Sequence, residues 1–299
     1  MLRALAEGPR DVASLASVTS LAPKTVAAAA DVLVAIGLAH RDGDRIRLDP
    51  GLVERCSRPE GHELLNAELR STVSSILGAT RAARDPASVV EGWRADDVDL
   101  VRAQGRLSRA VTRQMGMFFT GQPDLHARLS TPGARLLDVG AGAAGLCIAF
   151  AELYPTLHVV GIEPSATAVE AARAAIRAEG LDDRIEIRTG LGQSLDERAQ
   201  YAAAYVAQMF IPDDAIDAVL SATYEALEPG GLVFTGAMSH EGVDLVCSVS
   251  RFRNAIWGGS VRTSANVVEL LARAGFPDAM AMPVPPGALS PVMAHRPKS

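Results

Sequence analysis

The residues most able to do chemistry stand in one short stretch, "LLDVGAGAAG", which covers positions 136–145. Its apolar first half is typical of a buried strand, and in its second half Gly140, Gly142 and Gly145 satisfy the G-x-G-x-x-G spacing of a dinucleotide site. A side chain at Gly140 or Gly142 would keep the backbone away from a ligand. About 20 residues further on, Glu163 ends the next apolar run, where a carboxylate can bind ribose hydroxyls. The stretch therefore predicts a site for an adenosine-containing cofactor.

The charge of Asp138 separates two such cofactors. NAD and S-adenosylmethionine both contain an adenosine, so the glycines and Glu163 fit either one. An acidic side chain two positions before Gly140 is unfavourable beside a pyrophosphate, whereas it attracts the ammonium group of S-adenosylmethionine. We therefore expect S-adenosylmethionine as the cofactor.

The elements that position these residues follow from the pattern of the rest of the chain. From about residue 134, apolar runs alternate with helical patterns, which predicts an α/β fold with a Rossmann-like, doubly wound parallel sheet. Ligands of such sheets bind at the carboxyl ends of the strands, where the glycine stretch lies. Earlier in the chain, three helical patterns and a β-hairpin predict a winged helix. We expect a winged-helix domain over 1–58, a helical substrate-capping region over 59–130 and a cofactor-binding domain over 131–299.

Composition narrows the partners and the compartment. The 299 residues have a net charge of −6, which disfavours a protein that coats nucleic acid or an anionic membrane. The three cysteines lie far apart, so neither a structural zinc site nor a disulfide framework is expected. The longest apolar run, "TVAAAADVLVAIGLA", is too short for a membrane span and contains Asp31, and we expect no signal peptide after Met1. These features favour a cytoplasmic protein without a metal.

Four stretches together carry a family resemblance. "LLDVGAGAAG", "VVGIEP", "EALEPGGLVF" and "TSANVVELLARAGF" follow one another in the order and spacing of the class I S-adenosylmethionine-dependent methyltransferases. The similarity runs from about residue 100 to the end of the sequence. With a winged helix ahead of it, this part resembles the small-molecule O-methyltransferases of bacterial natural-product pathways and plants. The resemblance implies methyl transfer to a small molecule of secondary metabolism.

The resemblance also implies roles for individual residues around the cofactor. Asp138 would orient the amino group of the methionine moiety, and Glu163 would bind both ribose hydroxyls. Relatives often place an acidic residue after the third strand to meet the adenine. Here that stretch reads "RTGLGQS", so Gln193 or a backbone carbonyl would have to substitute. The full set expected at the cofactor is Ser108, Asp138, Gly140, Gly142, Gly145, Glu163, Pro164, Leu191, Gln193 and Gln208.

The sequence departs from the family at the catalytic base. Many relatives carry a histidine just after the fourth strand, but "AQMFIPDDA" places Met209 there, and a thioether cannot take a proton. The following Asp213 and Asp214 are interpreted as helix N-capping residues and not as metal ligands. Of the six histidines, His240 is expected after the fifth strand on the active face, where it is either a general base or an ordinary loop residue.

Two further readings of the function stay open. A thiol, amine, carboxylate or enolisable carbon can accept a methyl group with little help, because the sulfonium is already activated and alignment supplies much of the acceleration. The same fold could also use the positive sulfonium in a hydroxylation or cyclisation. A DNA-binding regulator is disfavoured because "PKTVAAAADVLVAIG" carries only one basic residue, Lys24. Such an apolar helix favours a homodimer contact.

Apolar side chains with a few polar groups predict the pocket for the acceptor, and the alternative is that the same residues belong to the core. An arginine stripe, Arg102, Arg106, Arg109 and Arg113, shares one helical face and is either solvated or a contact for a phosphorylated or carboxylate substrate. The expected acceptor-binding residues are Gln104, Met115, Phe118, Phe119, Met209, Arg253 and Trp257.

Overall fold

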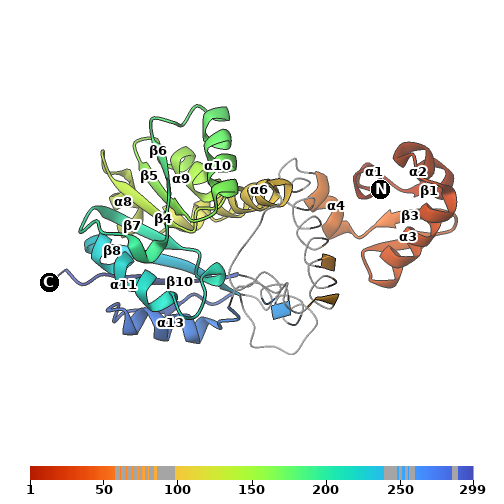
Figure 1. Ribbon diagram of the computed structural model, residues 1–299. Helices are drawn as coiled ribbons and strands as arrows, with labels where there is room; N and C mark the ends of the chain where they lie inside the picture. Colours follow the sequence, from red (N-terminus) through yellow and green to blue (C-terminus); the bar gives the residue numbers. More distant parts are fainter. Residues whose placement is uncertain are drawn as a thin grey trace. The chain divides into compact units, whose positions relative to one another are not determined.

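The computed structural model (Figure 1) describes residues 1–57, 98–238, 260–284 and 289–298 continuously, with scattered residues in 58–97 and 239–259. The chain divides into two compact units, Met1–Leu69 and Arg70–Ser299. The predicted His240, Arg253 and Trp257 lie outside the described residues.

The first unit contains the predicted three helices and hairpin. Asp11 caps the second helix by accepting a hydrogen bond from the Ser14 N–H, and Pro23 stands in the first turn of the third. Gly43, at φ +61°, forms the tip of the hairpin. Apolar side chains from these elements, among them Leu5, Leu15 and Ile46, form the core of the unit. The elements are α1 Leu2–Ala6, β1 Arg10–Asp11, α2 Val12–Thr19, α3 Pro23–Ala35, β2 Ala39–Asp42, β3 Arg45–Leu48 and α4 Pro50–Ser57.

Within the described ranges, no single helix is both long and apolar enough to cross a membrane. Helices α2 and α3 pass that test only as a pair bent by 111°, which is weak evidence because Leu15 and Val26 of these helices are buried in the core of the unit.

The second unit is built on a sheet with the order β6-β5-β4-β7-β8-β10-β9 among the described residues. β4 to β8 run parallel, β10 lies antiparallel to β8, and β9 lies antiparallel to β10. The predicted Rossmann-like α/β class is confirmed. The strands are β4 Arg135–Val139, β5 His158–Glu163, β6 Ile185–Thr189, β7 Tyr201–Val206, β8 Leu227–Met238, β9 Met280–Ala281 and β10 Leu289–His295.

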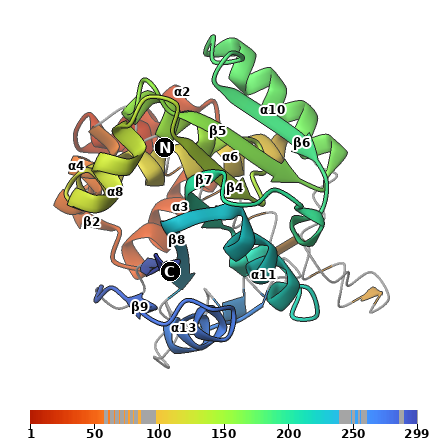
Figure 2. The same cartoon turned by 90° about the vertical axis from the view of Figure 1, so that its left-hand side faces the viewer.

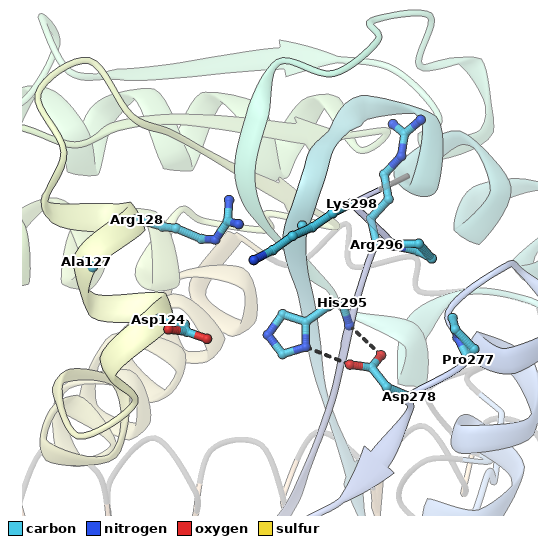
Figure 3. A pocket seen from close by; sticks show the side chains of 10 residues that line it. Asp124, Ala127, Arg128, Pro277, Asp278, His295, Arg296 and Lys298 are labelled. Carbon is cyan, nitrogen blue, oxygen red and sulfur yellow. Dashed lines mark hydrogen bonds and ion pairs between the residues drawn. The ribbon is translucent and has the colours of Figure 1, made fainter.

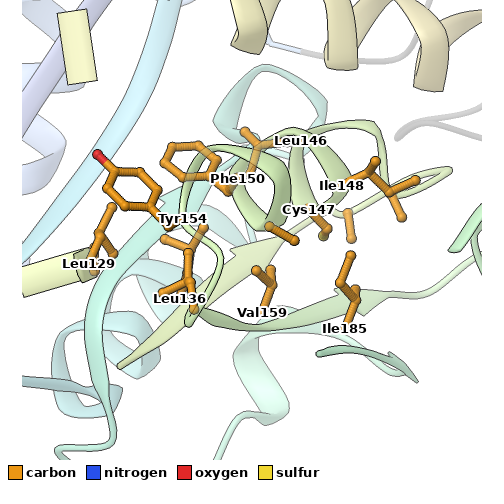
Figure 4. Packing of buried hydrophobic residues seen from close by; sticks show 14 of the residues in the cluster. Leu129, Leu136, Leu146, Cys147, Ile148, Phe150, Tyr154, Val159 and Ile185 are labelled. Carbon is orange, nitrogen blue, oxygen red and sulfur yellow. The ribbon is translucent and has the colours of Figure 1, made fainter. Parts of the chain in front are cut away.

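Helices cover both faces of this sheet (Figures 1 and 2). Side chains of α8, α9 and α10 meet one face. Figure 4 shows part of that core, with Phe150 of α9 and Tyr154, the residue after this helix, above Leu136 and Val159. Side chains of α11 and α13 form a second core on the opposite face. The helices are α6 Val98–Gln114, α7 Gly116–Thr120, α8 Pro123–Ser130, α9 Gly145–Leu153, α10 Ala166–Ala178, α11 Ile216–Ala226 and α13 Ser264–Arg273, with single turns η2 Gly192–Ser194 and η3 Gln208–Phe210.

Helix α6 packs closely against α9. A Cβ atom added to Gly145 would lie 1.9 Å from the carbonyl oxygen of Gly105, so the glycine at 145 is required by helix packing. The predicted cofactor contact of Gly145 stays a prediction. Two arginines of the stripe join α6 to its neighbours: Arg109 binds Glu152 of α9 and Glu179 at the end of α10, and Arg113 also binds Glu152. Arg102 and Arg106 are exposed. The solvated-face reading is wrong for Arg109, whose side chain is mostly buried in ion pairs, while the substrate-contact reading stays a prediction.

Candidate active site

The glycine turn leaves the carboxyl end of β4 in a conformation that needs glycine. Gly140 has φ +85° and Gly142 has φ +55°, which side chains rarely tolerate. The N–H groups of Gly140 and Ala141 both donate to the carbonyl of Ile162 on the neighbouring β5. No atom lies within 4 Å of a Cβ built at Gly142. The turn thus leaves open space beside its backbone at the point where the fold predicts a ligand.

Glu163 holds the same turn from the end of β5. One of its carboxylate oxygens accepts the N–H of Gly142 at 2.8 Å, and the other accepts the N–H of Ser165 at 2.9 Å. Its side chain is buried, which raises its pKa despite these two N–H groups. A carboxylate has about four acceptor positions, so two remain for hydroxyl donors. The predicted ribose contact therefore fits, and Glu163 has a structural role in addition.

Asp138 is buried behind the turn with one oxygen unsatisfied. Its Oδ2 accepts a hydrogen bond from the Cys147 thiol at 3.1 Å, while Oδ1 has no partner among the described residues. Burial, helped by the nearby charge of Glu163, raises the pKa of Asp138 to about 7 even though the hydrogen bond from the Cys147 thiol lowers it. A buried carboxylate oxygen without a partner is costly. A cationic donor such as the ammonium of S-adenosylmethionine would satisfy it, so the residues present fit the predicted cofactor.

The segment after β6 reaches the same edge of the sheet. A Cβ on Gly192 would lie 2.6 Å from Val139 of β4, so η2 packs directly on the strand that carries the glycine turn. Leu191 precedes η2 with about half of its side chain exposed, and Gln193 and Pro164 are exposed. Their predicted cofactor contacts stay predictions. Gly192 was missed by the sequence reasoning, although its place in "RTGLGQS" was a signal.

Helix α6 lies over the other side of the turn. A Cβ on Gly105 would meet Ala143 at 2.7 Å, which places α6 against the glycine turn. Gln104, one residue before Gly105, and Ser108, one helical turn after it, are both half-buried. The structure thus brings both predicted residues to the neighbourhood of the turn.

A buried arginine fixes the loop after β7. Arg262 donates to the carbonyls of Gln208 at 2.6 Å and of Ile211 at 3.1 Å, and its guanidinium also binds Asp213 at 2.6 Å. The amide of Gln208 donates to Gly236 of β8 and accepts from Arg262. Its predicted cofactor contact is wrong, because this amide is used inside the protein.

Asp213 is likewise not a helix cap. Helix α11 begins after Ala215 without a side-chain cap, and the Asp213 carboxylate instead accepts from Ser260 and Arg262. These hydrogen bonds, the one from Ser260 first, lower the pKa of Asp213. Among the described residues there is also no cluster of metal-ligating side chains.

Met209 occupies η3 on this clamped loop and is nearly buried. The described histidines lie elsewhere. His158 opens β5 at the amino edge of the sheet, His126 is on α8, His295 ends β10, and His40 belongs to the first unit. In the part of the chain that the structure describes, no imidazole is therefore available at the carboxyl edge.

The aromatic and methionine residues predicted to bind the acceptor differ in their burial. Phe119 is 4% exposed and packs against Phe150 and Phe234, with ring centroids 4.9 Å and 5.5 Å away. Its ring is therefore part of the core, and its contact with the acceptor stays a prediction. Phe118 and Met115 are half-buried at the margin of this core and stay candidates.

The comparisons with known proteins agree with this geometry. Residues 136–231 match the sequence profile of the family described as "Methyltransferase domain". Residues 136–231 of the second unit therefore carry a methyltransferase domain. The demethylspheroidene O-methyltransferase of Cereibacter sphaeroides is 26% identical over 99% of this chain and 81% of that protein.

Two further comparisons differ in how much of the chain they cover. The carboxy-S-adenosyl-L-methionine synthase of Alteromonas mediterranea is 30% identical, but the match covers only 34% of this chain and 44% of that protein. The solved structure of the mitomycin 7-O-methyltransferase MmcR is 18% identical, has a TM-score of 0.67, and aligns with 98% of this chain and 94% of that chain. The predicted methyltransferase fold and S-adenosylmethionine as the family's cofactor are confirmed.

Proposed function

We propose that this methyltransferase transfers the methyl group of S-adenosylmethionine to an oxygen of a small-molecule acceptor in a natural-product pathway of the cytoplasm. The single observation that carries the cofactor half is the glycine turn tied to Glu163, with the unsatisfied oxygen of Asp138 behind it. The similarity to demethylspheroidene O-methyltransferase, which extends over nearly the whole chain, supports oxygen as the acceptor atom.

Different side chains of the protein contact the cofactor and the acceptor in this proposal. When bound, S-adenosylmethionine supplies a methyl carbon already activated by the adjacent sulfonium. Asp138 and Glu163 offer negative charge and acceptor oxygens to its ammonium and ribose, and the Gly140–Gly142 turn lets the backbone approach it. On the acceptor side, Arg262 fixes the loop that carries Met209, whose thioether contributes an apolar contact and no base.

Proton removal from the acceptor has two candidate routes. His240 follows β8 by two positions and is our proposed general base. Alternatively, the acceptor ionises by itself near neutral pH, as an acidic phenol or a carboxylic acid does, and alignment alone is sufficient.

A direct test incubates the full chain with S-adenosylmethionine carrying an isotopically labelled methyl group and a panel of phenols, hydroxyquinones and carboxylic acids. The proposal predicts S-adenosylhomocysteine together with a product that carries the label on oxygen. Formation of a hydroxylated or cyclised product without label transfer would contradict it and support the non-methylating alternative.

We also propose that the first unit forms a homodimer contact. Its surface exposes apolar side chains on and around α3, and Val32 and Ile36 are 59% and 60% exposed. Helix α3 carries one basic residue, Lys24, which is too little charge to hold a DNA backbone. Sedimentation of the full chain should show a dimer that Val32→Glu with Ile36→Glu converts to a monomer. A wild-type monomer at micromolar concentration would contradict the proposal.

A further inference from the structure

A hollow of about 540 Å³ opens in the second unit at the edge opposite the glycine turn. Figure 3 shows it between α8 on one side and the segments that follow α13 and β10 on the other. Gly230, near the amino end of β8, lies in its wall. Because β8 runs parallel to β4 through β7, this hollow is at the amino edge of the sheet, whereas the glycine turn is at the carboxyl edge. The lining residues are Asp124, Ala127, Arg128, Gly230, Pro277, Asp278, His295, Arg296, Pro297 and Lys298.

Two cationic side chains meet over Gly230. A Cβ atom at this glycine would lie 2.6 Å from a guanidinium nitrogen of Arg128 and 3.1 Å from Cγ of Lys298. The charged ends of Arg128 and Lys298 point toward one another in Figure 3. Neither side chain forms an ion pair with a residue that the structure describes. Two like charges held together without a counter-ion are unfavourable.

The other charges of the hollow do not neutralise this pair. The carboxylate of Asp278 accepts a hydrogen bond from the backbone N–H of His295 at 2.8 Å. Its other oxygen lies 2.8 Å from the ring Nδ1 of the same histidine. The guanidinium of Arg296 donates to the carbonyls of Tyr224, Glu225 and Leu227 at the end of α11, so its charge meets no carboxylate. Asp124 lines the hollow without an ion pair to either cation. Apart from His295, the lining carries Arg128, Arg296 and Lys298 against only Asp124 and Asp278, an excess of positive charge in a chain of net charge −6.

We infer that this hollow binds an anion of the phosphate class, held between the Arg128 guanidinium and the Lys298 ammonium. A phosphate presents several acceptor oxygens and up to two negative charges, which match the fork of an arginine and the point charge of a lysine. Gly230 is part of the proposed anion site, because any side chain at this position would occupy the space between the two cationic groups. The ligand is either free phosphate or a phosphate monoester, and the same contacts serve both.

The test is calorimetric titration of the full chain with inorganic phosphate, with glycerol phosphate and with acetate, at constant ionic strength. We expect saturable binding of at least one of the two phosphates and weaker binding of acetate. Arg128→Gln with Lys298→Gln should weaken phosphate binding by about 10-fold or more, since charge-assisted hydrogen bonds to both groups are lost. The matched control, Arg47→Gln with Arg177→Gln, removes two exposed charges elsewhere and should leave the affinity unchanged.

Phosphate affinity that is equal in the wild-type protein and in the Arg128→Gln, Lys298→Gln variant would overturn the inference, as would the absence of saturable binding in the wild type. The binding of S-adenosylhomocysteine should be the same in all three proteins, because the hollow and the glycine turn lie at opposite edges of the sheet. The inference therefore stands or falls independently of the proposed methyl transfer.

Discussion

The carboxylate of Glu163 accepts the backbone N–H of Gly142 at 2.8 Å, which joins the end of β5 to the glycine turn after β4. Its second oxygen accepts the N–H of Ser165, so the side chain is fixed on both sides before any ligand binds. Glu163 thus shapes the turn in the absence of the cofactor and presents its remaining acceptor positions to it.

Glu163→Gln should weaken S-adenosylhomocysteine binding nearly as much as Glu163→Ala, by roughly 1–3 kcal/mol. The amide has one oxygen and one NH₂ group, so one of the two backbone N–H groups would face a donor instead of an acceptor. Isothermal titration calorimetry measures the affinity, and Glu170→Gln on the exposed side of α10 is the control. Wild-type affinity in Glu163→Gln would show that this carboxylate neither holds the turn nor binds the ribose.

Asp138 should make the stability of the ligand-free protein fall as the pH rises. Its pKa is raised from 3.8 to about 7 in the folded protein, mainly by burial. Between these values the folded protein binds the proton and the unfolded chain does not, so folding is favoured at the acidic end and this advantage is lost toward pH 7. Urea unfolding at about pH 5 and about pH 7.5 should show this loss in the wild type and a smaller one in Asp138→Asn.

The same carboxyl should couple cofactor binding to proton release. The groups facing it are the Cys147 thiol on α9, Glu163 on β5 and Tyr205 on β7, and none is cationic. A bound ammonium favours the ionised form of Asp138, so affinity for S-adenosylhomocysteine should rise with pH until about pH 7. Titrations in buffers of different ionisation enthalpy should detect the released proton. Affinity that is independent of pH would contradict the predicted contact.

Arg262→Gln should lower the free energy of unfolding by about 1–3 kcal/mol, because the carbonyls of Gln208 and Ile211 lose their buried donor. Asp213→Asn should cost less than about 1 kcal/mol, because the Asp213 side chain is 82% exposed while Arg262 is 7% exposed. Denaturant unfolding compares the two. An equal loss of unfolding free energy in the two variants would mean that the ion pair with Asp213 stabilises the loop more than the hydrogen bonds to its carbonyls do.

His240→Ala should lower turnover on the native acceptor by about 10²–10⁴-fold and leave S-adenosylhomocysteine affinity unchanged, if His240 removes the proton. The pH–rate profile should also lose an acidic limb near a pKa of about 6.5. His126→Ala, on exposed α8, is the matched control. Wild-type turnover in His240→Ala would leave alignment as the source of the acceleration.

Local patterns were sufficient for the parts of the site that lie within one βαβ unit. The glycine turn, Asp138 and Glu163 are adjacent in sequence to the strands that place them, so spacing alone predicted their edge of the sheet. The alternation of apolar runs and helices predicted β4 to β8 for the same reason. Strand β10 was missed because Pro291 removes a ladder donor and breaks the usual strand pattern.

Residues whose roles depend on distant partners could not be predicted. Arg262 lies about 50 residues after the loop it fixes, and nothing in "SVRTSAN" indicates that its guanidinium would be buried beside Gln208. The packing roles of Gly145 and Phe119 were not predicted either, because they depend on how α6 packs on α9 and how α7 packs on the core. Such contacts arise only when separate elements pack together.

The most direct test of the central claim is calorimetric titration of the purified full chain with S-adenosylhomocysteine and, separately, with NAD. We expect saturable binding of S-adenosylhomocysteine and no heat from NAD, because the carboxylate of Asp138 behind the glycine turn disfavours a pyrophosphate there. Binding of NAD in place of S-adenosylhomocysteine would contradict the account.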